Sequence, residues 1–323
     1  MEDNKKRKIT SIGGSALIEG IMMRGPKKTT VAVRVKDGEI YTEDIPFTSI
    51  TAKAKILRLP LIRGVFGLVD SMRLSFKSLS IAADKAMEGA EDEVEEMSKF
   101  EKWLTDKLGK NFTKALMVFA SIIGIALSFV LFFMFPTWLY NTATTNFLPD
   151  LTGNIFIRSA FEGVFRIILF LVYIIACSQM KDMKRVFKYH GAEHKTIACY
   201  EDNQELTVEN VKKYTRFHPR CGTSFLVIML IIAILIGLFV PITDPLLRSV
   251  VKILLLPLTC GIGYELIKIC GKYENVFTRI VATPGLLAQR ITTKEPDADM
   301  IEVAIKAMVS VIPENGEDIL NEK

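Results

Sequence analysis

One run of residues limits the fold of this chain more than any other feature. Ala115–Phe135 contains 21 residues and no charged side chain. A helix of that length extends about 31 Å, which matches the hydrocarbon core of a bilayer. Pro136, Trp138 and Tyr140 follow, and this order is typical of a helix that leaves the bilayer at its interface. The run therefore predicts a transmembrane helix.

Three more apolar runs predict three further transmembrane helices. They cover Ile155–Cys177, Phe225–Ile242 and Leu246–Cys270. Pro257 and the glycines Gly261 and Gly263 should bend or break the last of them. The chain is 50% hydrophobic and its mean hydropathy is +0.28, which agrees with a membrane protein. We expect a mainly α membrane protein with four transmembrane helices, in residues 115–177 and 224–270.

The polar segments predict a small cytoplasmic α+β portion, formed by residues 1–114, 178–223 and 271–323. Asp37-Gly38 separates two β-branched stretches and predicts a β-hairpin over about residues 29–47. Pro60–Ala83 is apolar at helical spacing but carries several basic residues. It predicts an amphipathic helix that lies on the membrane face or packs on the cytosolic portion.

Two other polar segments have simple interpretations. Glu88–Glu96 is an acidic run, typical of a solvated linker or an exposed helix. Pro296 and Asp297 precede an apolar stripe near the C-terminal end, which predicts a capped amphipathic helix packed on the soluble portion.

The distribution of basic residues predicts the orientation in the membrane. Residues 178–223 carry nine Lys/Arg, whereas 136–157 and 241–245 carry none. The positive-inside rule then places both termini and the 178–223 loop in the cytoplasm of a multi-pass cell-membrane protein. The five cysteines form no CxxC pair, which fits a reducing compartment. The net charge of +5 is too small to indicate a nucleic-acid partner, and we expect none. The expected partner is the lipid bilayer, with a membrane-embedded or cytoplasmic protein as a further possibility.

The three histidines of the chain fall within 29 residues, in the predicted cytoplasmic loop. His190 and His194 share one face of a helix, so both imidazoles can reach one cation. Glu193 lies between them and completes H-x-x-E-H, the spacing of inverzincin-type zinc peptidases. In that mechanism the glutamate accepts a proton from the attacking water. Glu193 is therefore the candidate catalytic base, and zinc is the expected divalent metal.

A catalytic zinc site needs a third protein ligand. His218 is the first candidate, Cys221 the second, and Glu201 is also possible. A site that includes Cys221 and the other histidines could instead be closed and structural. Without metal, juxtamembrane histidines make ordinary hydrogen bonds or contact lipid phosphates, helped by basic neighbours such as Arg220.

Several charges lie in apolar surroundings. Arg158, Glu162 and Arg166 follow one another at four-residue spacing in the second predicted span. They lie in the headgroup region, or they line a polar path. Glu19 and Arg24 are isolated charges in a glycine-rich stretch. They form a buried ion pair or surface turn charges, or they belong to the site.

Four motifs give the chain a family resemblance. They are Gly13–Pro26, Tyr189–Lys195, His218–Phe225 and Thr292–Pro296. With these motifs the chain resembles the YqhQ-like proteins, a family of bacterial multi-pass membrane proteins described as predicted metal-dependent enzymes. The resemblance implies a metal at His190, His194 and His218. It also implies that residues 13–26 belong to the functional core, which would bring Glu19 and Arg24 near the histidines.

Three functions are compatible with these observations. The first is a metal-dependent membrane enzyme, most plausibly a hydrolase that acts on a peptide or lipid at the cytoplasmic membrane face. The second is a non-enzymatic scaffold or complex partner with a structural His/Cys site. The third is a small transporter, which would use the charges in the second span and Glu265.

Overall fold

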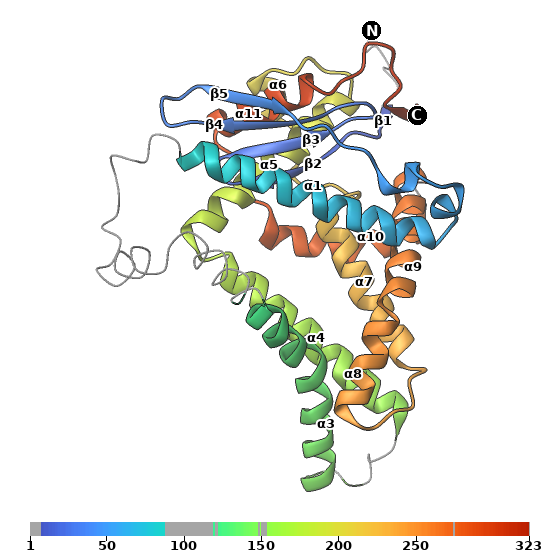
Figure 1. Ribbon diagram of the computed structural model, residues 1–323. Coiled ribbons are helices and arrows are strands. Elements are labelled where there is room, and N and C mark those ends of the chain that lie inside the picture. Colours follow the sequence, from blue (N-terminus) through green and yellow to red (C-terminus); the bar gives the residue numbers. More distant parts are fainter. Residues whose placement is uncertain are drawn as a thin grey trace, which may run out of the picture. The chain divides into compact units, whose positions relative to one another are not determined.

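The computed structural model describes residues 8–87, 119, 122–147, 149, 154–273 and 275–322. The chain divides into two compact units, both built from separate stretches of sequence (Figure 1). The first comprises Met1–Gly89, Val172–Ile232 and Pro257–Lys323, and the second comprises Ala90–Leu171 and Ala233–Leu256. The predicted acidic linker Glu88–Glu96 and most of residues 115–121 lie outside the described residues.

An antiparallel four-stranded sheet forms the centre of the first unit, in the order β2-β3-β4-β5. Its strands are β2 (Gly13–Leu17), β3 (Gly20–Arg24), β4 (Thr29–Arg34) and β5 (Ile40–Asp44). The predicted hairpin is confirmed, because β4 pairs with β5 through Arg34 and Ile40, and Gly38 adopts a φ of 89° in the connection. The glycine-rich stretch before it, for which we predicted no strands, forms β2 and β3.

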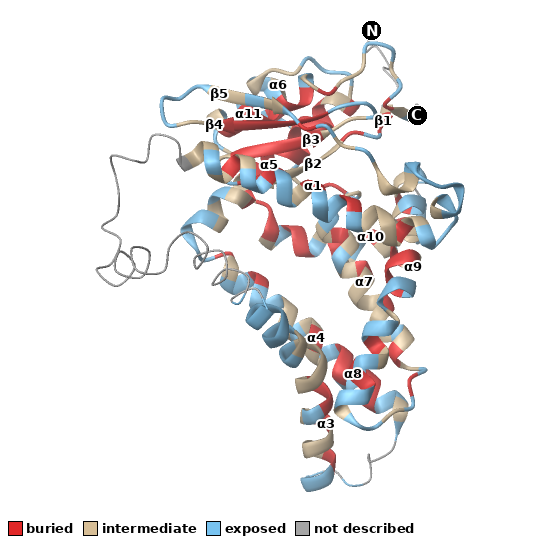
Figure 2. Cartoon of the chain, in the orientation of Figure 1, coloured by how far each residue is buried: buried red, intermediate tan, exposed pale blue. Residues whose placement is uncertain are grey.

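The two faces of this sheet are covered by different helices. Ile21, Met23 and Ala32 face a core shared with α5 (Lys181–Glu201) and α11 (Ala298–Val309). Their neighbours along the strands face α1 (Ile62–Met87). This alternation is the period-two pattern of a strand that is buried on both faces. Figure 2 shows β3 and β4 coloured as buried.

The helices of the first unit partly follow the predictions. α1 is the expected amphipathic helix, and α11 begins after Asp297 as expected. α10 (Val276–Thr292) was not predicted, because we interpreted its region only as polar. It starts with a capping box in which Asn275 and Thr278 exchange hydrogen bonds. The unit also contains three shorter elements: η1 (Ile50–Ala52), η2 (Lys55–Arg58) and α6 (Val208–Lys212).

Strands from near the two ends of the chain form a second, two-stranded sheet. β1 (Lys8–Thr10) pairs antiparallel with β6 (Ile319–Glu322). Asp318, just before β6, is fully buried, and its carboxylate accepts hydrogen bonds from the hydroxyls of Thr10 at 2.6 Å and Tyr200 at 3.0 Å. This sheet therefore attaches both ends of the described chain to the C-terminal turn of α5.

Two helices in the described part of the chain are long and apolar enough to cross a membrane. They are Ile122–Asn146 and α4 (Ile155–Cys177). The first contains a π-helical turn, η4 (Val130–Met134), and continues as α3 (Phe135–Asn146). The predicted end of this helix at Pro136 is wrong. Pro136 lies in the first turn of α3, directly after the wider π-turn, where a missing N–H is tolerated.

The remaining apolar segments depart from four straight spans. α7 (Gly222–Gly237) has 16 residues and extends about 24 Å, so it is short for a span. α8 (Pro245–Leu254) and α9 (Leu256–Lys272) meet at an angle of 46°. The expected bend near Pro257 is thus present, at Leu255, which separates the two helices two residues before the proline. Pro257 has no N–H to donate to the carbonyl four residues earlier, and its ring crowds that carbonyl. The described residues contain two candidate spans, or three if the bent pair is one.

Candidate metal site

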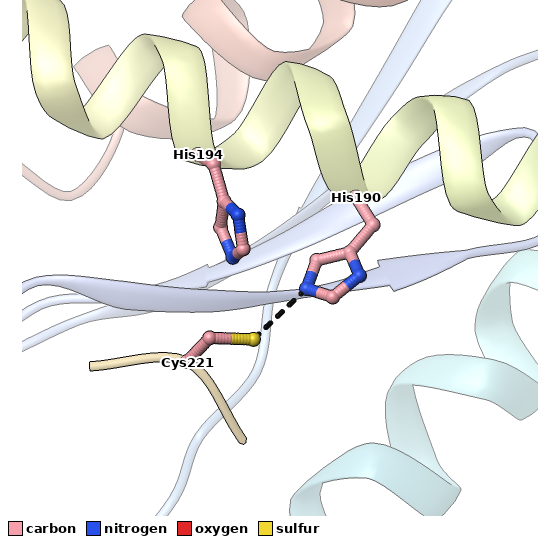
Figure 3. Close-up of side chains that lie close together, drawn as sticks. All are labelled: His190, His194 and Cys221. Carbon is pink, nitrogen blue, oxygen red and sulfur yellow. Dashed lines mark hydrogen bonds between the residues drawn. The ribbon is translucent and has the colours of Figure 1, made fainter. Parts of the chain in front are cut away.

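α5 carries the H-x-x-E-H motif in its buried C-terminal half. Residues from Tyr189 onward pack against the sheet and α11, which fixes the rotation of the helix. His190 and His194 therefore project together from one side of it, and their ring centroids lie 4.4 Å apart (Figure 3). The predicted helical placement of the two imidazoles on one face is present in the structure.

Cys221 approaches both histidines from the loop that precedes α7. Its Sγ lies 3.1 Å from Nε2 of His190, as the dashed line in Figure 3 marks. The three candidate ligand atoms of His190, His194 and Cys221 all lie within 4.8 Å of one another. His194 and Cys221 are buried and His190 is partly buried. Two imidazoles and one thiol thus converge at one point.

Backbone carbonyls orient the two imidazoles. Nδ1 of His190 is 2.9 Å from the carbonyl oxygen of Thr292, and Nδ1 of His194 is 2.6 Å from that of Arg216. A carbonyl can only accept, so each Nδ1 carries the proton and each Nε2 keeps its lone pair. Metal-ligating histidines are commonly oriented by such a second hydrogen bond.

Glu193 lies on the side of α5 that faces β2. The residue is 5% exposed. Its carboxylate accepts a hydrogen bond from the Gly14 N–H, and Oε2 has no partner among the described residues. Burial raises the pKa of the Glu193 carboxyl to about 7, although His190 and the Gly14 N–H act in the opposite direction. A buried carboxylate oxygen with no partner beside a candidate ligand is the kind of atom that a water or substrate proton can satisfy.

Gly14 is needed for this approach, and we did not single it out from the sequence. A Cβ at this position would lie 2.6 Å from the Met22 carbonyl oxygen and 3.0 Å from Cδ of Glu193. Only a glycine lets the β2 backbone reach the carboxylate. The pair Gly13-Gly14 in the first motif indicated that the backbone approaches another group closely, but it did not indicate that this group is the Glu193 carboxylate.

The segment that follows α10 also borders the site, next to α5 and the loop that carries Cys221. The Lys294 N–H donates to the Phe187 carbonyl at 2.8 Å, and Glu295 pairs with Lys195 at 2.7 Å. This places the Thr292 carbonyl against His190. The carbonyls of Thr292 and Arg216 are the functional groups that the sequence analysis missed. Every residue has a backbone carbonyl, so the amino-acid sequence does not indicate which carbonyls orient a histidine.

His218 lies beside the three converging residues, not among them. Its ring centroid is 5.5 Å from that of His194. Its Nε2 is 3.4 Å from the Arg220 guanidinium and 4.0 Å from the Glu201 carboxylate. Arg220 also pairs directly with Glu201, and Glu201 accepts from the Thr10 N–H at 2.9 Å. Arg220 thus connects the His218 loop to strand β1.

Glu19 and Arg24 have separate partners. Glu19, in the turn between β2 and β3 with a φ of 51°, pairs with Arg185 and accepts a hydrogen bond from the Tyr189 hydroxyl at 3.3 Å. The guanidinium of Arg24 lies over the Phe47 ring at 4.9 Å. Glu19 therefore contacts the residue before His190, whereas Arg24 packs against an aromatic ring at the other end of β3.

The charges of the second predicted span form a buried cluster in the second unit. Glu162 is fully buried and pairs with Lys252, with Arg248 at 3.0 Å and with Arg166 at 3.4 Å. Arg158 donates to the Thr243 carbonyl at 3.0 Å and lies against Tyr140. The cluster joins α4 to α8. Glu265, in the first unit, pairs instead with Arg63.

Comparison with known proteins places the chain in a family. The family described as "Protein of unknown function (DUF1385)" matches residues 59–314. The chain is 34% identical over 302 residues to "Uncharacterized protein YqhQ" of Bacillus subtilis (strain 168), covering 91% of this chain and 90% of that protein. No solved structure matches. The expected resemblance is confirmed: the chain belongs to the DUF1385 family of YqhQ-like proteins.

Proposed function

We propose that this chain is a zinc-dependent hydrolase of the cell membrane, with its site on the cytoplasmic side. The observation that supports this best is the convergence of His190, His194 and Cys221, whose ligand atoms lie within 4.8 Å of one another. Three protein ligands leave one position of a tetrahedral zinc site open, as catalytic sites require.

The donor set fits zinc. Imidazole nitrogen and thiolate sulfur are ligands that zinc prefers, whereas calcium and magnesium take oxygen. The proton on each Nδ1 points at a backbone carbonyl, so both Nε2 lone pairs are available without rearrangement. Zinc, when bound, would supply Lewis acidity and a nucleophile at neutral pH.

Glu193 has the role of general base in this proposal. Its unpartnered Oε2 accepts the proton of the attacking water and then delivers it to the leaving group. The Gly14 N–H holds the other side of the carboxylate. Arg220 acts indirectly, because it holds the His218 loop against Glu201. A polar site at the membrane face suits a peptide or lipid substrate.

A structural zinc site is the competing function, and His218 favours it. Its ring centroid is 5.5 Å from that of His194, so a small rotation of the loop would add a fourth ligand. Four protein ligands close a zinc site and leave no position for substrate. The chain would then be a scaffold or complex partner, with the metal stabilising its cytoplasmic fold.

The proposed topology has four membrane crossings with both termini in the cytoplasm. Two crossings are Ile122–Asn146 and α4, and the short α7 and the bent pair α8–α9 supply the others. The basic residues of α5 and the following loop then face the cytoplasm, as the positive-inside rule favours. The candidate metal site lies in this same region.

Metal content of the purified full chain tests the proposal. We expect one zinc per chain in the wild type, and none in the His190→Ala/His194→Ala double variant. Cys199→Ser, which changes a fully buried cysteine outside the site, is the control and should keep the metal. A wild type without stoichiometric metal, or a double variant that retains it, would refute a metal site at these residues.

Catalysis is tested separately from binding. Fluorogenic peptides and fluorogenic phospholipids are the substrates, and Glu193→Gln is the variant. We expect turnover in the wild type and loss of turnover in Glu193→Gln, with zinc retained. X-ray absorption should show two nitrogens, one sulfur and one oxygen around the zinc. Three nitrogens and one sulfur, with no turnover, would favour the structural site.

A further inference from the structure

α1 exposes a row of apolar side chains on the side away from the sheet. Val69, Met72, Phe76 and Leu79 recur at three- and four-residue spacing and are all exposed, with Phe76 at 70%. The opposite side of the helix is buried against the sheet through Leu74 and Ala82. An exposed apolar stripe of this length is uncommon on a soluble surface.

α10 has a second face of the same kind. Val276, Phe277, Ile280 and Leu287 are exposed, with Phe277 at 56%. The buried side of α10 carries Gln289, whose side chain hydrogen-bonds both the N–H and the carbonyl of His218, at 2.8 and 2.7 Å. One side of α10 thus supports the candidate metal site, and the other side is apolar and exposed.

The charges beside these faces are mostly positive. Residues 50–87, up to the end of α1, contain seven cations and two acids, Asp70 and the exposed Asp84. Asp70 is only 2% exposed and accepts from Ser49 and the Ile50 N–H. α10 contains Arg279 and Arg290 and no acidic residue. An exposed apolar face flanked by cations is the composition of helices that lie in an anionic lipid interface.

Both helices pack against apolar helices, α10 at helix ends and α1 along the middle of α9. Gly285 of α10 lies against Ser224, in the first turn of α7, and the Thr278 carbonyl accepts from Cys270, in the last turn of α9. Gly64 of α1 lies against Tyr264 of α9. The start of α7 and the end of α9 are the points where apolar segments meet polar sequence, which is the level of the headgroups.

We propose that α1 and α10 are interfacial helices whose exposed apolar faces lie in the headgroup region of an anionic lipid leaflet. In this arrangement the lipid headgroups and upper acyl chains cover the apolar faces of α1 and α10. The contact is separate from that of the helices that cross the bilayer. Because α10 holds His218 through Gln289 and orients His190 through Thr292, this contact fixes the candidate metal site close to the lipid surface. The proposal does not depend on metal binding or on catalysis.

Tryptophan fluorescence of the full chain in single-copy nanodiscs tests this contact. Both native tryptophans, Trp103 and Trp138, are first replaced by phenylalanine. Phe76→Trp and Phe277→Trp then place one fluorophore on each face. Val309→Trp is the matched control, because Val309 is also exposed but lies on α11, across the sheet from α1. Four of these five substitutions affect exposed side chains, and the fifth, Trp103→Phe, keeps an aromatic ring, so folding should persist.

Lipids brominated near the headgroup should quench the fluorophores at positions 76 and 277 and leave position 309 bright. Aqueous iodide should quench position 309 alone. Arg73→Glu with Lys77→Glu should reduce the lipid quenching at position 76 when the lipids are anionic. Iodide quenching at 76 and 277 without bromolipid quenching would overturn the proposal. If the fluorophores at positions 76 and 277 were protected from iodide in proteoliposomes but not in single-copy nanodiscs, the apolar faces would be covered by a second copy of the chain, and the lipid proposal would be wrong.

Discussion

The carbonyl oxygen of Lys294 lies directly against the Cα of Gly191. A Cβ added to Gly191 would stand 2.0 Å from that oxygen and 3.2 Å from its carbon, closer than any side chain can tolerate. The glycine inside the H-x-x-E-H motif thus has a packing role, because its lack of a side chain lets the segment after α10 lie against α5. Through that segment the Thr292 carbonyl reaches His190.

Gly191→Ala should therefore lower both stability and metal affinity. Relief of the clash needs a backbone shift, which typically costs about 1–3 kcal/mol. Thermal unfolding in detergent measures the first effect and zinc titration the second. Gly222→Ala is the matched control beside Cys221, where a Cβ would meet nothing within 4 Å. Equal behaviour of the two variants would contradict the packing role of Gly191.

Removal of metal should destabilise the wild type and leave the ligand double variant unchanged. A ligand that binds only the folded state at one hundred times its Kd adds about 2.7 kcal/mol. A strong chelator should thus lower the unfolding temperature of the wild type, and zinc should restore it. His190→Ala/His194→Ala should unfold at one temperature with or without chelator. A chelator response in that variant would place the metal elsewhere.

Glu162→Ala should strongly destabilise the second unit. Its carboxylate is fully buried and pairs with three cations, so its removal leaves buried positive charge uncompensated. Loss of one partner in a buried pair costs about 3–5 kcal/mol. Glu302→Gln, which changes an exposed pair with Arg34, should have little effect.

A double-mutant cycle refines this expectation. Glu162→Leu and Arg248→Met together should cost less than the sum of the two single changes, because the interaction between Glu162 and Arg248 is lost in each single variant and is therefore counted twice in the sum. Steric trapping or denaturant unfolding in detergent gives the free energies of unfolding. Additive costs would show that the pair does not stabilise the unit as a pair.

Glu201→Gln should loosen the two-stranded sheet and the His218 loop together. Glu201 is 2% exposed, accepts from the Thr10 N–H and pairs with Arg220. Leaving such groups partly unsatisfied costs about 1–3 kcal/mol. Hydrogen exchange should accelerate in β1 and β6. Glu317→Gln, which removes an exposed pair with Lys27, should leave exchange unchanged there; a response equal to that of Glu201→Gln would argue against the specific role.

Local sequence signals predicted those elements that local physics determines. The Asp37-Gly38 turn, the amphipathic α1 and the start of α11 after Asp297 each depend on a few neighbouring residues, and each is present. Asp297 occupies the N-cap position, but its side chain makes no capping hydrogen bond and pairs with Lys188 instead. β2 and β3 were missed because their glycines resemble turns. They form strands since both faces are covered by helices, which is a tertiary effect that overrides propensity.

The candidate site shows the same division. Helical periodicity alone places His190 and His194 on one face, with Glu193 beside them. The loop that carries His218 and Cys221 has no such constraint, and the sequence left both as candidate ligands. Cys221 converges with the two histidines because its neighbour Arg220 is held in place. Arg220 pairs with Glu201 of α5 and donates a hydrogen bond to the carbonyl of Thr10, which lies near the N-terminus.

The pairing of β1 with β6 has a consequence for biosynthesis. Glu201, and with it the loop that carries Cys221, is held by strand residues 8–10, and those strand residues are held by residues 318–322. The apolar helices can enter the bilayer while translation continues. The arrangement around the histidines is completed only after residue 322 has left the ribosome. A nascent chain that stops short of β6 would thus be inserted in the membrane and still immature.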